Sequence, residues 1–483
     1  MPLITPFDTI AAVSTPPGEG GIGIVRMSGA EAFGIARRIF SPRRKKDALE
    51  EHRSFTMRLG TIRDGGRVID EVLVSLMKAP HTYTREDVVE INCHGGAVAV
   101  NEVLRCVLAS GARLAEPGEF TKRAFVNGRI DLAQAEAVLD VVRAKTSASL
   151  EAALGQLGGG LSARIRSIAD RLKGLLVSLE AAIDFAEEED APEFSPREQH
   201  SRIAAIGGEL DFLIGSYDTG RIYRDGVLTA LVGKPNVGKS SLLNAFLRFD
   251  RAIVTPIPGT TRDVIEEQLN IAGIPFILAD TAGITESDDL IEREGVRRSR
   301  AYLERADLVL LVFDGASPLD ERDIEIARGA KDRACIPVLN KTDLPLLFDE
   351  RQLVGETGLS RGFVRVSAAT GTGLKELEGR MTETVARGSA GADYSAMVSS
   401  TRHYNSLVRA RSELARALET LSGRGLDPGA GDVGRGESVA GVQWPELVAL
   451  DVRNALDFLG EITGEAAGAE ILDMIFSSFC IGK

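Results

Sequence analysis

One eight-residue segment, residues 233–240, constrains the fold of this chain more than any other. It reads Gly-Lys-Pro-Asn-Val-Gly-Lys-Ser, follows the apolar run 227–232 directly and precedes the helical pattern 241–247. Glycines in such a strand-loop-helix unit let backbone N–H groups turn toward phosphate oxygens, and the helix N-terminus adds partial positive charge. The segment therefore predicts a phosphate-binding loop at the carboxyl end of a parallel strand.

Side chains of this loop and of later strand ends indicate the ligand. Lys239 is expected to reach the β- and γ-phosphates, and the Ser240 hydroxyl to ligate Mg²⁺. At the end of the apolar run 276–279, Asp280 can hold the magnesium shell, and the N–H of Gly283 can sense the γ-phosphate. Further on, the Asp343 carboxylate can accept two hydrogen bonds from guanine, whereas adenine offers no such pair of donors. The ordered set predicts a GTP site.

The region around these motifs alternates short apolar runs with helical stretches, which predicts a doubly wound parallel sheet. Helical spacing of apolar residues begins after Asp131 and returns beyond this region, so we infer that the α/β domain is inserted into a helical domain. Residues 1–125 mix β-branched runs with Gly/Pro turns, which predicts a small α+β domain. The expected domains are 1–125 (α+β), 126–217 (helical, first part), 218–387 (α/β) and 388–483 (helical, second part).

Charge and cysteine content exclude several classes of protein. The chain has 57 Lys and Arg residues against 70 Asp and Glu residues, a formal net charge of −13, which argues against a protein that coats nucleic acid or anionic membranes. No apolar stretch approaches the roughly 20 residues that span a bilayer. The sequence contains no C-x-x-C pair, so neither a disulfide framework nor a zinc site is indicated. We expect a cytoplasmic protein without membrane attachment, whose packing cysteines are Cys93, Cys106 and Cys335.

Several segments resemble one family, the bacterial MnmE (TrmE) tRNA-modification GTPases. The sequence Gly259-Thr260-Thr261-Arg262-Asp263 resembles its switch I motif, and Phe479-Cys480-Ile481-Gly482-Lys483 resembles its carboxyl terminus. Further resemblances lie at residues 14–26, 86–96, 117–125 and 131–136. The resemblance covers essentially the whole chain. It implies a folate-type α+β domain, a helical domain, and a Ras-like G domain inserted in the helical domain.

The resemblance also implies how GTP is hydrolysed. Ile284 stands where a Ras-like protein carries a water-orienting Gln, so another device is needed. In the family a K⁺ ion neutralises charge in the transition state, which implies the ligands Asn236, Thr255, Ile257 and Thr260. Glu292 matches the family's water-orienting residue, although charge patterning alone would make it a solvated helix residue. The catalytic residues predicted are Glu292, Lys239 and Asn236, and those predicted for Mg²⁺ are Ser240 and Thr261.

The whole predicted GTP-binding set extends over five segments of the chain. Its members are Asn236, Val237, Gly238, Lys239, Ser240, Ser241, Thr255, Pro256, Ile257, Pro258, Gly259, Thr260, Thr261, Asp280, Thr281, Ala282, Gly283, Asn340, Lys341, Asp343, Ser367, Ala368 and Ala369.

For the amino-terminal domain the resemblance implies a site for a 5-formyl-tetrahydrofolate-type cofactor, formed by Arg26, Glu90, Arg129 and Lys483. The two arginines could pair with the carboxylates of the cofactor's glutamate tail, and Glu90 could accept hydrogen bonds from the pterin. Each residue also has an ordinary interpretation as a surface ion pair or a strand-end charge. For Cys480, packing of a docked end and a role in the modification chemistry stay equally open.

These implications define one principal hypothesis and one alternative. The first is a homodimeric GTP hydrolase that acts with an FAD-dependent, MnmG-type partner in a heterotetramer. It would add a carboxymethylaminomethyl-type group at C5 of the wobble uridine of certain tRNAs, with K⁺-stimulated hydrolysis driving a conformational change. The alternative is a regulatory GTPase switch that binds RNA or the ribosome without modification chemistry.

Overall fold

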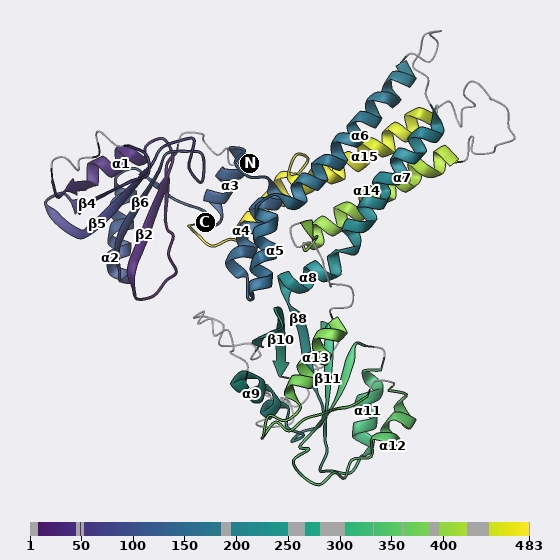
Figure 1. Cartoon of the computed structure of the whole chain (residues 1–483). Helices are drawn as coiled ribbons and strands as arrows, with labels where there is room; N and C mark the ends of the chain where they lie inside the picture. The colour runs from purple at the N-terminus through teal and green to yellow at the C-terminus, as the bar shows by residue number, and fades with distance from the viewer. Residues whose placement is uncertain are drawn as a thin grey trace. The chain divides into compact units, whose positions relative to one another are not determined.

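The computed structural model describes residues 8–44, 49, 53–184, 195–249, 266–280, 305–331, 333–359, 362–385, 396–422 and 444–482. The chain groups into two compact units (Figure 1). Unit 1 comprises Met1–Leu139, Ser162–Pro196 and Glu419–Lys483, and unit 2 comprises Asp140–Leu161 and Arg197–Leu418. Among the described residues, none of the helices combines the length and apolarity needed to cross a membrane.

Unit 1 contains a seven-stranded sheet in the order β3-β4-β5-β6-β2-β1-β7, antiparallel except for the pair β1 and β7. Its strands are β1 (Ile10–Val13), β2 (Gly20–Ser28), β3 (Phe40–Pro42), β4 (Thr56–Asp64), β5 (Arg67–Met77), β6 (Val88–Gly95) and β7 (Arg113–Leu114). Alternate residues such as Val72, Val74 and Leu76 are buried with apolar residues of α1 (Ala32–Ile39) and α2 (Ala97–Ala109). The period of two in the sequence therefore produced one buried face of this sheet.

The helices of unit 1 follow the predicted periodicity. They are α3 (Glu119–Val126), α4 (Leu132–Arg143), α6 (Gly160–Asp184), α15 (Trp444–Thr463) and α16 (Ala469–Ser477). The apolar stripe of α6 is buried as its spacing predicts. Beyond α16, the Ser14 hydroxyl donates to the Gly482 carbonyl at 3.2 Å, which fixes the chain's end beside β2.

Unit 2 contains a six-stranded sheet in the order β13-β12-β11-β8-β10-β9. Its strands are β8 (Val227–Val232), β9 (Glu266–Ile271), β10 (Ile274–Asp280), β11 (Leu308–Asp314), β12 (Cys335–Asn340) and β13 (Val364–Arg365). The predicted apolar runs 227–232 and 276–279 form β8 and part of β10, and these strands are parallel to β11, β12 and β13. The sequence pattern missed β9, an antiparallel edge strand that begins with polar residues.

The described helices of this α/β domain are α9 (Lys239–Phe249), α11 (Glu321–Gly329), α12 (Glu350–Thr357) and α13 (Leu374–Val385). Two separate apolar clusters lie on the sheet, one of which includes residues of α9 and α13 and the other residues of α11 and α12. The sheet is therefore covered on both faces, as the alternation of strands and helices predicts. In such a fold, ligands bind at the carboxyl ends of the strands, where the strand order reverses.

Unit 2 also holds α5 (Ser147–Leu157), most of α7 (Pro196–Gly215), α8 (Tyr217–Asp225) and most of α14 (Thr401–Ser422). Helix α8 leads into the α/β domain, and residues 396–400 lead from it into α14. These two connecting segments pack together. The rings of Tyr217 and Tyr404 stack with centroids 4.4 Å apart. A Cβ on Gly220 would lie 2.1 Å from the Val398 carbonyl oxygen, so only glycine permits this approach.

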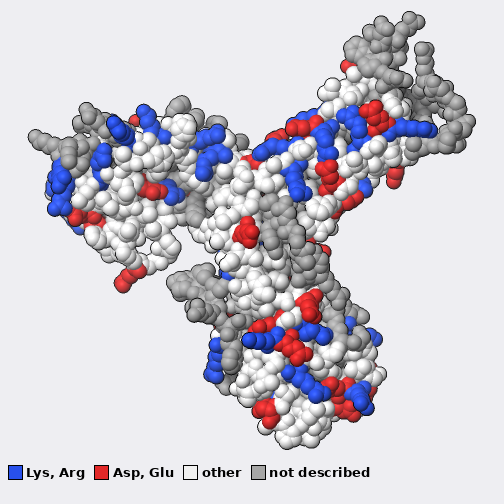
Figure 2. Space-filling model, in the orientation of Figure 1, with Lys and Arg blue, Asp and Glu red and all other residues white. Residues whose placement is uncertain are grey.

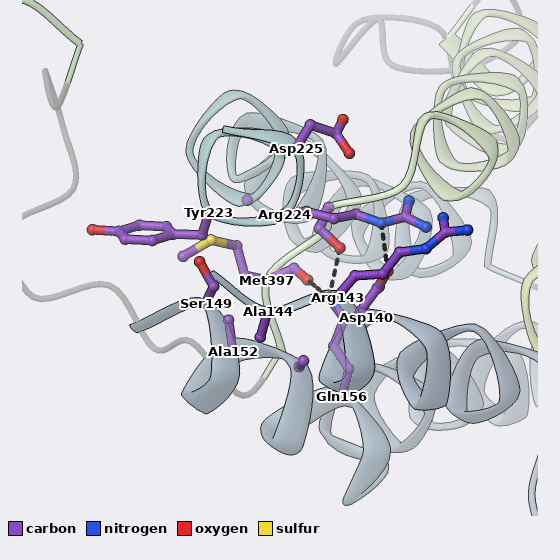
Figure 3. Close-up of a pocket in the computed structure, with 13 residues that line it drawn as sticks. Asp140, Arg143, Ala144, Ser149, Ala152, Gln156, Tyr223, Arg224, Asp225 and Met397 are labelled. Carbon is purple, nitrogen blue, oxygen red and sulfur yellow. Dashed lines mark hydrogen bonds and ion pairs between the residues drawn. The ribbon is translucent and has the colours of Figure 1, made fainter. Parts of the chain in front are cut away.

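A hollow of about 90 Å³ lies beside these connecting segments (Figure 3). The Gln156 amide of α5 donates to the Met397 carbonyl at 2.9 Å, and Arg224 of α8 pairs with Asp140 at 2.9 Å. Polar contacts therefore border the hollow: one joins α5 to the segment before α14, and the other joins α8 to Asp140. On the molecular face shown in Figure 2, acidic and basic side chains intermix over the helices and the α/β domain.

Candidate functional site

The phosphate loop, residues 233–238, joins β8 to α9 in a tight curl. Asn236 and Gly238 have positive φ angles of 63° and 97°. A Cβ on Gly238 would lie 2.3 Å from the Asn340 amide nitrogen, and a Cβ on Gly233 would lie 2.2 Å from the Val312 carbonyl oxygen. Both glycines are therefore required by close approach of the loop to neighbouring strands, as well as by backbone conformation at Gly238.

Lys239 lies inside this curl. Its side chain is buried, and its Nζ donates to the carbonyl oxygens of Gly233 at 2.8 Å and Lys234 at 2.7 Å. The ammonium is thus held over the loop, where it can also contact phosphate oxygens. Ser240, the predicted Mg²⁺ ligand, is exposed in the first turn of α9.

The predicted guanine-binding residues gather beside the phosphate loop. The Asn340 amide donates to the Val237 carbonyl at 2.9 Å, and Lys341 Nζ donates to the Asn236 carbonyl at 2.9 Å. The Ser367 hydroxyl donates to one Asp343 carboxylate oxygen at 2.6 Å, which orients this exposed carboxylate. Three of the five predicted GTP-binding segments therefore meet at the carboxyl ends of β8, β12 and β13.

Asp314, at the end of β11, supports this group and was not predicted. Its Oδ2 accepts a hydrogen bond from Lys341 Nζ at 2.6 Å. Burial alone would raise the pKa of Asp314, but hydrogen bonds from Lys341 and the Ala316 N–H, together with the positive charge of Lys341, outweigh burial and lower that pKa. The carboxylate therefore stays charged and keeps Lys341 in contact with the phosphate loop.

Part of the predicted site lies outside the described residues, and Asp280 is described only as the last residue of β10. The predicted residues outside the description are Thr255, Pro256, Ile257, Pro258, Gly259, Thr260, Thr261, Thr281, Ala282, Gly283 and Glu292. Lys483 also lies outside it. The predictions that rest on these residues remain predictions.

In unit 1, the predicted folate residues line two adjoining hollows, which we call the amino-terminal groove. The first, of about 240 Å³, contains Arg26 and Glu90, whose side chains pair at 2.8 Å across β2 and β6. The second, of about 430 Å³, contains Arg129. Met77 and Tyr83 line both hollows, so the two hollows adjoin at these side chains. Arg26 also donates to the Gly482 carbonyl at 3.4 Å, which brings the chain's end to the groove.

Two sequence profiles of known families match this chain, one over the amino-terminal domain and one over the remainder. The profile described as "GTP-binding protein TrmE N-terminus" matches residues 9–129, and that described as "MnmE helical domain" matches residues 132–480. The chain belongs to the MnmE family. The membership confirms that the resemblance to this family extends beyond the phosphate loop to the segments on both sides of it.

Curated MnmE relatives align along the full chain. The "tRNA modification GTPase MnmE" of Thermoanaerobacter pseudethanolicus is 47% identical over 481 residues, covering 99% of this chain and 100% of the relative. The protein of the same name from Carboxydothermus hydrogenoformans is 48% identical over 481 residues, covering 99% of both chains. That of Geobacillus thermodenitrificans is 46% identical over 483 residues, covering 99% of this chain and 100% of the relative.

In this MnmE chain, Tyr83 is a groove residue that the sequence motifs did not reveal. Its hydroxyl lies 2.9 Å from the Thr121 hydroxyl, and the Arg129 guanidinium lies 4.7 Å from its ring centroid. Burial raises the pKa of Tyr83. The neutral ring is therefore a fixed wall that orients Arg129 by a cation–π contact.

The cysteines of this MnmE chain separate into two classes. Cys93, Cys106 and Cys335 are buried, as packing residues should be, and burial raises the pKa of Cys93 to about 11. Cys480 is exposed, although the adjacent Phe479 is buried. The exposure of Cys480 does not favour the packing alternative, and both interpretations of this thiol stay predictions.

A network of charges close to the groove connects the start of the described chain to α3. Glu119 accepts hydrogen bonds from Arg113 at 2.7 Å and from Arg123 at 3.0 Å, and both arginines also pair with Asp8. Burial alone would raise the pKa of Glu119, but hydrogen bonds from Arg113, the Glu116 N–H and Arg123, with the charge of Arg123, together outweigh burial and lower that pKa from its ordinary value of 4.5. Glu119 and Arg123 each lie two residues along α3 from Thr121, the partner of Tyr83.

Proposed function

We propose that this chain hydrolyses GTP to drive modification of the wobble uridine in certain tRNAs. The convergence of Lys239, Asn340 and Asp343 around one loop carries the nucleotide part of the proposal. Lys239 would contact the β- and γ-phosphates, and Asp343 would accept hydrogen bonds from guanine. The tRNA part rests on the similarity to curated relatives named as tRNA modification GTPases.

Within this proposal, Ser240 and Thr261 hold Mg²⁺, and Asn236, Thr255, Ile257 and Thr260 hold K⁺. Asn236 supports this assignment because it lies at the exposed side of the phosphate loop. When bound, the two cations would offset negative charge on the phosphates. Glu292 would orient the attacking water.

The ion assignment predicts faster GTP hydrolysis when K⁺ replaces Na⁺ at constant ionic strength. Asn236→Ala should remove that difference, because a ligand of K⁺ is lost. The measurement is phosphate release with the full chain at saturating GTP and Mg²⁺. Equal rates of the unaltered chain in the two salts would refute the K⁺ assignment.

The amino-terminal groove would hold the 5-formyl-tetrahydrofolate-type cofactor. Arg26 and Arg129 supply positive charge at two places along it, and Glu90 holds Arg26 at 2.8 Å. One Glu90 oxygen would serve Arg26, and the other would be an acceptor for the pterin. Lys483 and Cys480 would act at the chain's end, which Arg26 contacts through Gly482.

The remaining assignments complete the proposal. The domains are 1–125 for folate and dimerisation, 126–217 and 388–483 for the helical domain, and 218–387 for the G domain. The chain would form a cytoplasmic homodimer and join an FAD-dependent, MnmG-type protein to add the carboxymethylaminomethyl-type group.

The deciding experiment is mass spectrometry of tRNA nucleosides from cells with and without the gene. Loss of the modified wobble uridine, with its return when the gene is restored, would support the proposal. Calorimetry with 5-formyl-tetrahydrofolate and the full chain separates it from a purely regulatory GTPase. Unchanged nucleosides and no folate uptake would favour that alternative.

A further inference from the structure

The second residue of the phosphate loop, Lys234, turns its side chain away from the loop. Its Nζ lies 2.8 Å from Asp320 Oδ2 and 2.8 Å from Asp323 Oδ2. The Lys234 side chain is 16% exposed and that of Asp323 only 3%, so water competes weakly for this pair.

The two carboxylates are themselves held in place. Asp320 is the N-cap of α11, and its Oδ1 accepts the Asp323 N–H at 3.1 Å. In return, Asp323 Oδ2 accepts the Asp320 N–H at 3.3 Å. This capping box fixes both side chains at the start of a helix. Lys234 is therefore anchored to a rigid element beside the sheet.

The backbone of Lys234 is in direct contact with the group expected to bind phosphate. Its carbonyl oxygen accepts a hydrogen bond from Lys239 Nζ at 2.7 Å. An ordered chain of contacts therefore runs from α11 through the Lys234 side chain and carbonyl to the Lys239 ammonium. Anchoring the side chain restricts rotation of the peptide that holds this ammonium.

We propose that Lys234 is a positioning residue for GTP hydrolysis, acting through Asp320 and Asp323 on one side and Lys239 on the other. This inference rests on the proposed GTPase function. Lys234 supplies no charge directly to the phosphates, because its ammonium is neutralised by two carboxylates. Its task is to keep Lys239 where charge develops in the transition state.

The test is steady-state GTP hydrolysis by the full chain, with kcat and KM measured separately. Lys234→Met should lower kcat about tenfold with a smaller change in KM, because a displaced charge costs more in the transition state than in the ground state. Lys234→Arg should restore most of the rate, since a guanidinium can pair with both carboxylates. The matched control is Arg328→Met, which removes a looser 3.8 Å pair from the far end of the same helix and should leave kcat unchanged.

A double-mutant cycle separates positioning from direct phosphate contact. Asp320→Asn with Asp323→Asn should reduce kcat much as Lys234→Met does, and adding Lys234→Met should then change it less than about twofold. If Lys234 touched phosphate, removing the carboxylates would free it and maintain or raise kcat. That result would overturn the inference.

Two further measurements complete the test: thermal unfolding of each variant and GTP hydrolysis by the unaltered chain. Thermal unfolding identifies the folded fraction of each variant, so that kcat is expressed per folded molecule. A lower melting temperature with unchanged kcat per folded molecule would make Lys234 merely structural and overturn the inference. No hydrolysis by the unaltered chain would instead contradict the proposed function, whereas normal hydrolysis by both the unaltered chain and Lys234→Met would contradict the inference alone.

Discussion

The phosphate loop and the amino-terminal groove present two ways of building a binding site. The loop is a continuous segment in which backbone N–H groups are expected to bind phosphate. Lys239 and contacts from Asn340 and Lys341 support its conformation. The groove is formed by side chains that are far apart in the sequence and are brought together by a sheet. A backbone site therefore depends on local conformation, whereas a side-chain site depends on the packing of a whole domain.

The largest expected effect tests the loop alone. Lys239→Met removes the ammonium while keeping most of the side-chain volume. GTP hydrolysis should fall about 1,000-fold, equal to about 4 kcal/mol. Uptake of 5-formyl-tetrahydrofolate by the same variant, measured by calorimetry, should be unchanged. Loss of both activities would mean that the two sites do not respond separately.

The next effect tests the dependence of the groove on its domain. Glu119→Gln should lower the free energy of unfolding of unit 1 by about 3 kcal/mol at pH 7, because the buried Arg123 loses a charged partner. Urea unfolding can be followed by fluorescence of Trp444, the single tryptophan, which lies in unit 1. Glu350→Gln, which removes the partner of Arg365 in unit 2, is the control and should leave this transition unchanged.

The same carboxylate predicts a pH dependence. The pKa of Glu119 is lower in the folded chain than its ordinary value of 4.5, so its stabilising contribution is present above about pH 4.5 and is lost as the pH falls through the folded pKa. Acid should therefore destabilise unit 1 less in Glu119→Gln than in the unaltered chain. Identical acid sensitivity of the two proteins would contradict the role of Glu119.

A smaller effect tests a side chain within the groove. Arg26→Met should weaken binding of 5-formyl-tetrahydrofolate about 30-fold, because a charge-assisted hydrogen bond worth about 2 kcal/mol is lost. GTP hydrolysis without folate should stay unchanged. Arg38→Met, which alters an exposed arginine of α1 outside the groove, is the matched control for calorimetry. Equal affinity of Arg26→Met and the unaltered chain would place the cofactor elsewhere.

The smallest effect concerns the wall of the groove. Tyr83→Leu keeps an apolar surface but removes the ring beneath Arg129. Folate affinity should fall about fivefold, the loss expected for a cation–π contact of about 1 kcal/mol. Tyr83→Phe keeps the ring and should lose less, because only the contact with the Thr121 hydroxyl disappears. A greater loss for Tyr83→Phe than for Tyr83→Leu would contradict this ordering.

The difference between the two sites also explains what the sequence could predict. The strand before Gly233, the loop and the later strand ends follow from local patterns, because glycine conformation and parallel-strand geometry determine where their backbone lies. Arg26, Glu90 and Arg129 came only from the family resemblance. Nothing in their spacing marks them as neighbours, because cross-strand register depends on the assembled sheet.

Residues that position other side chains could not be predicted from the sequence either, because their roles also depend on the assembled fold. Lys234 and Asp314 have ordinary sequence surroundings, and their roles depend on contacts with residues up to 89 positions away. Tyr83 is an aromatic residue between β5 and β6, and only the fold places it beside Arg129. The polar start of β9 concealed an edge strand because such strands need fewer apolar residues.

The two connecting segments, α8 and residues 396–400, have a consequence for how this architecture can be altered. Tyr217 and Thr401 share a hydrogen bond of 2.8 Å, so the two ends of the nucleotide-binding insert are already adjacent. A short turn could replace everything between them without stretching either flanking helix. The insert is therefore a cassette in the topological sense, which recombination could excise or exchange while the surrounding helices keep their connection.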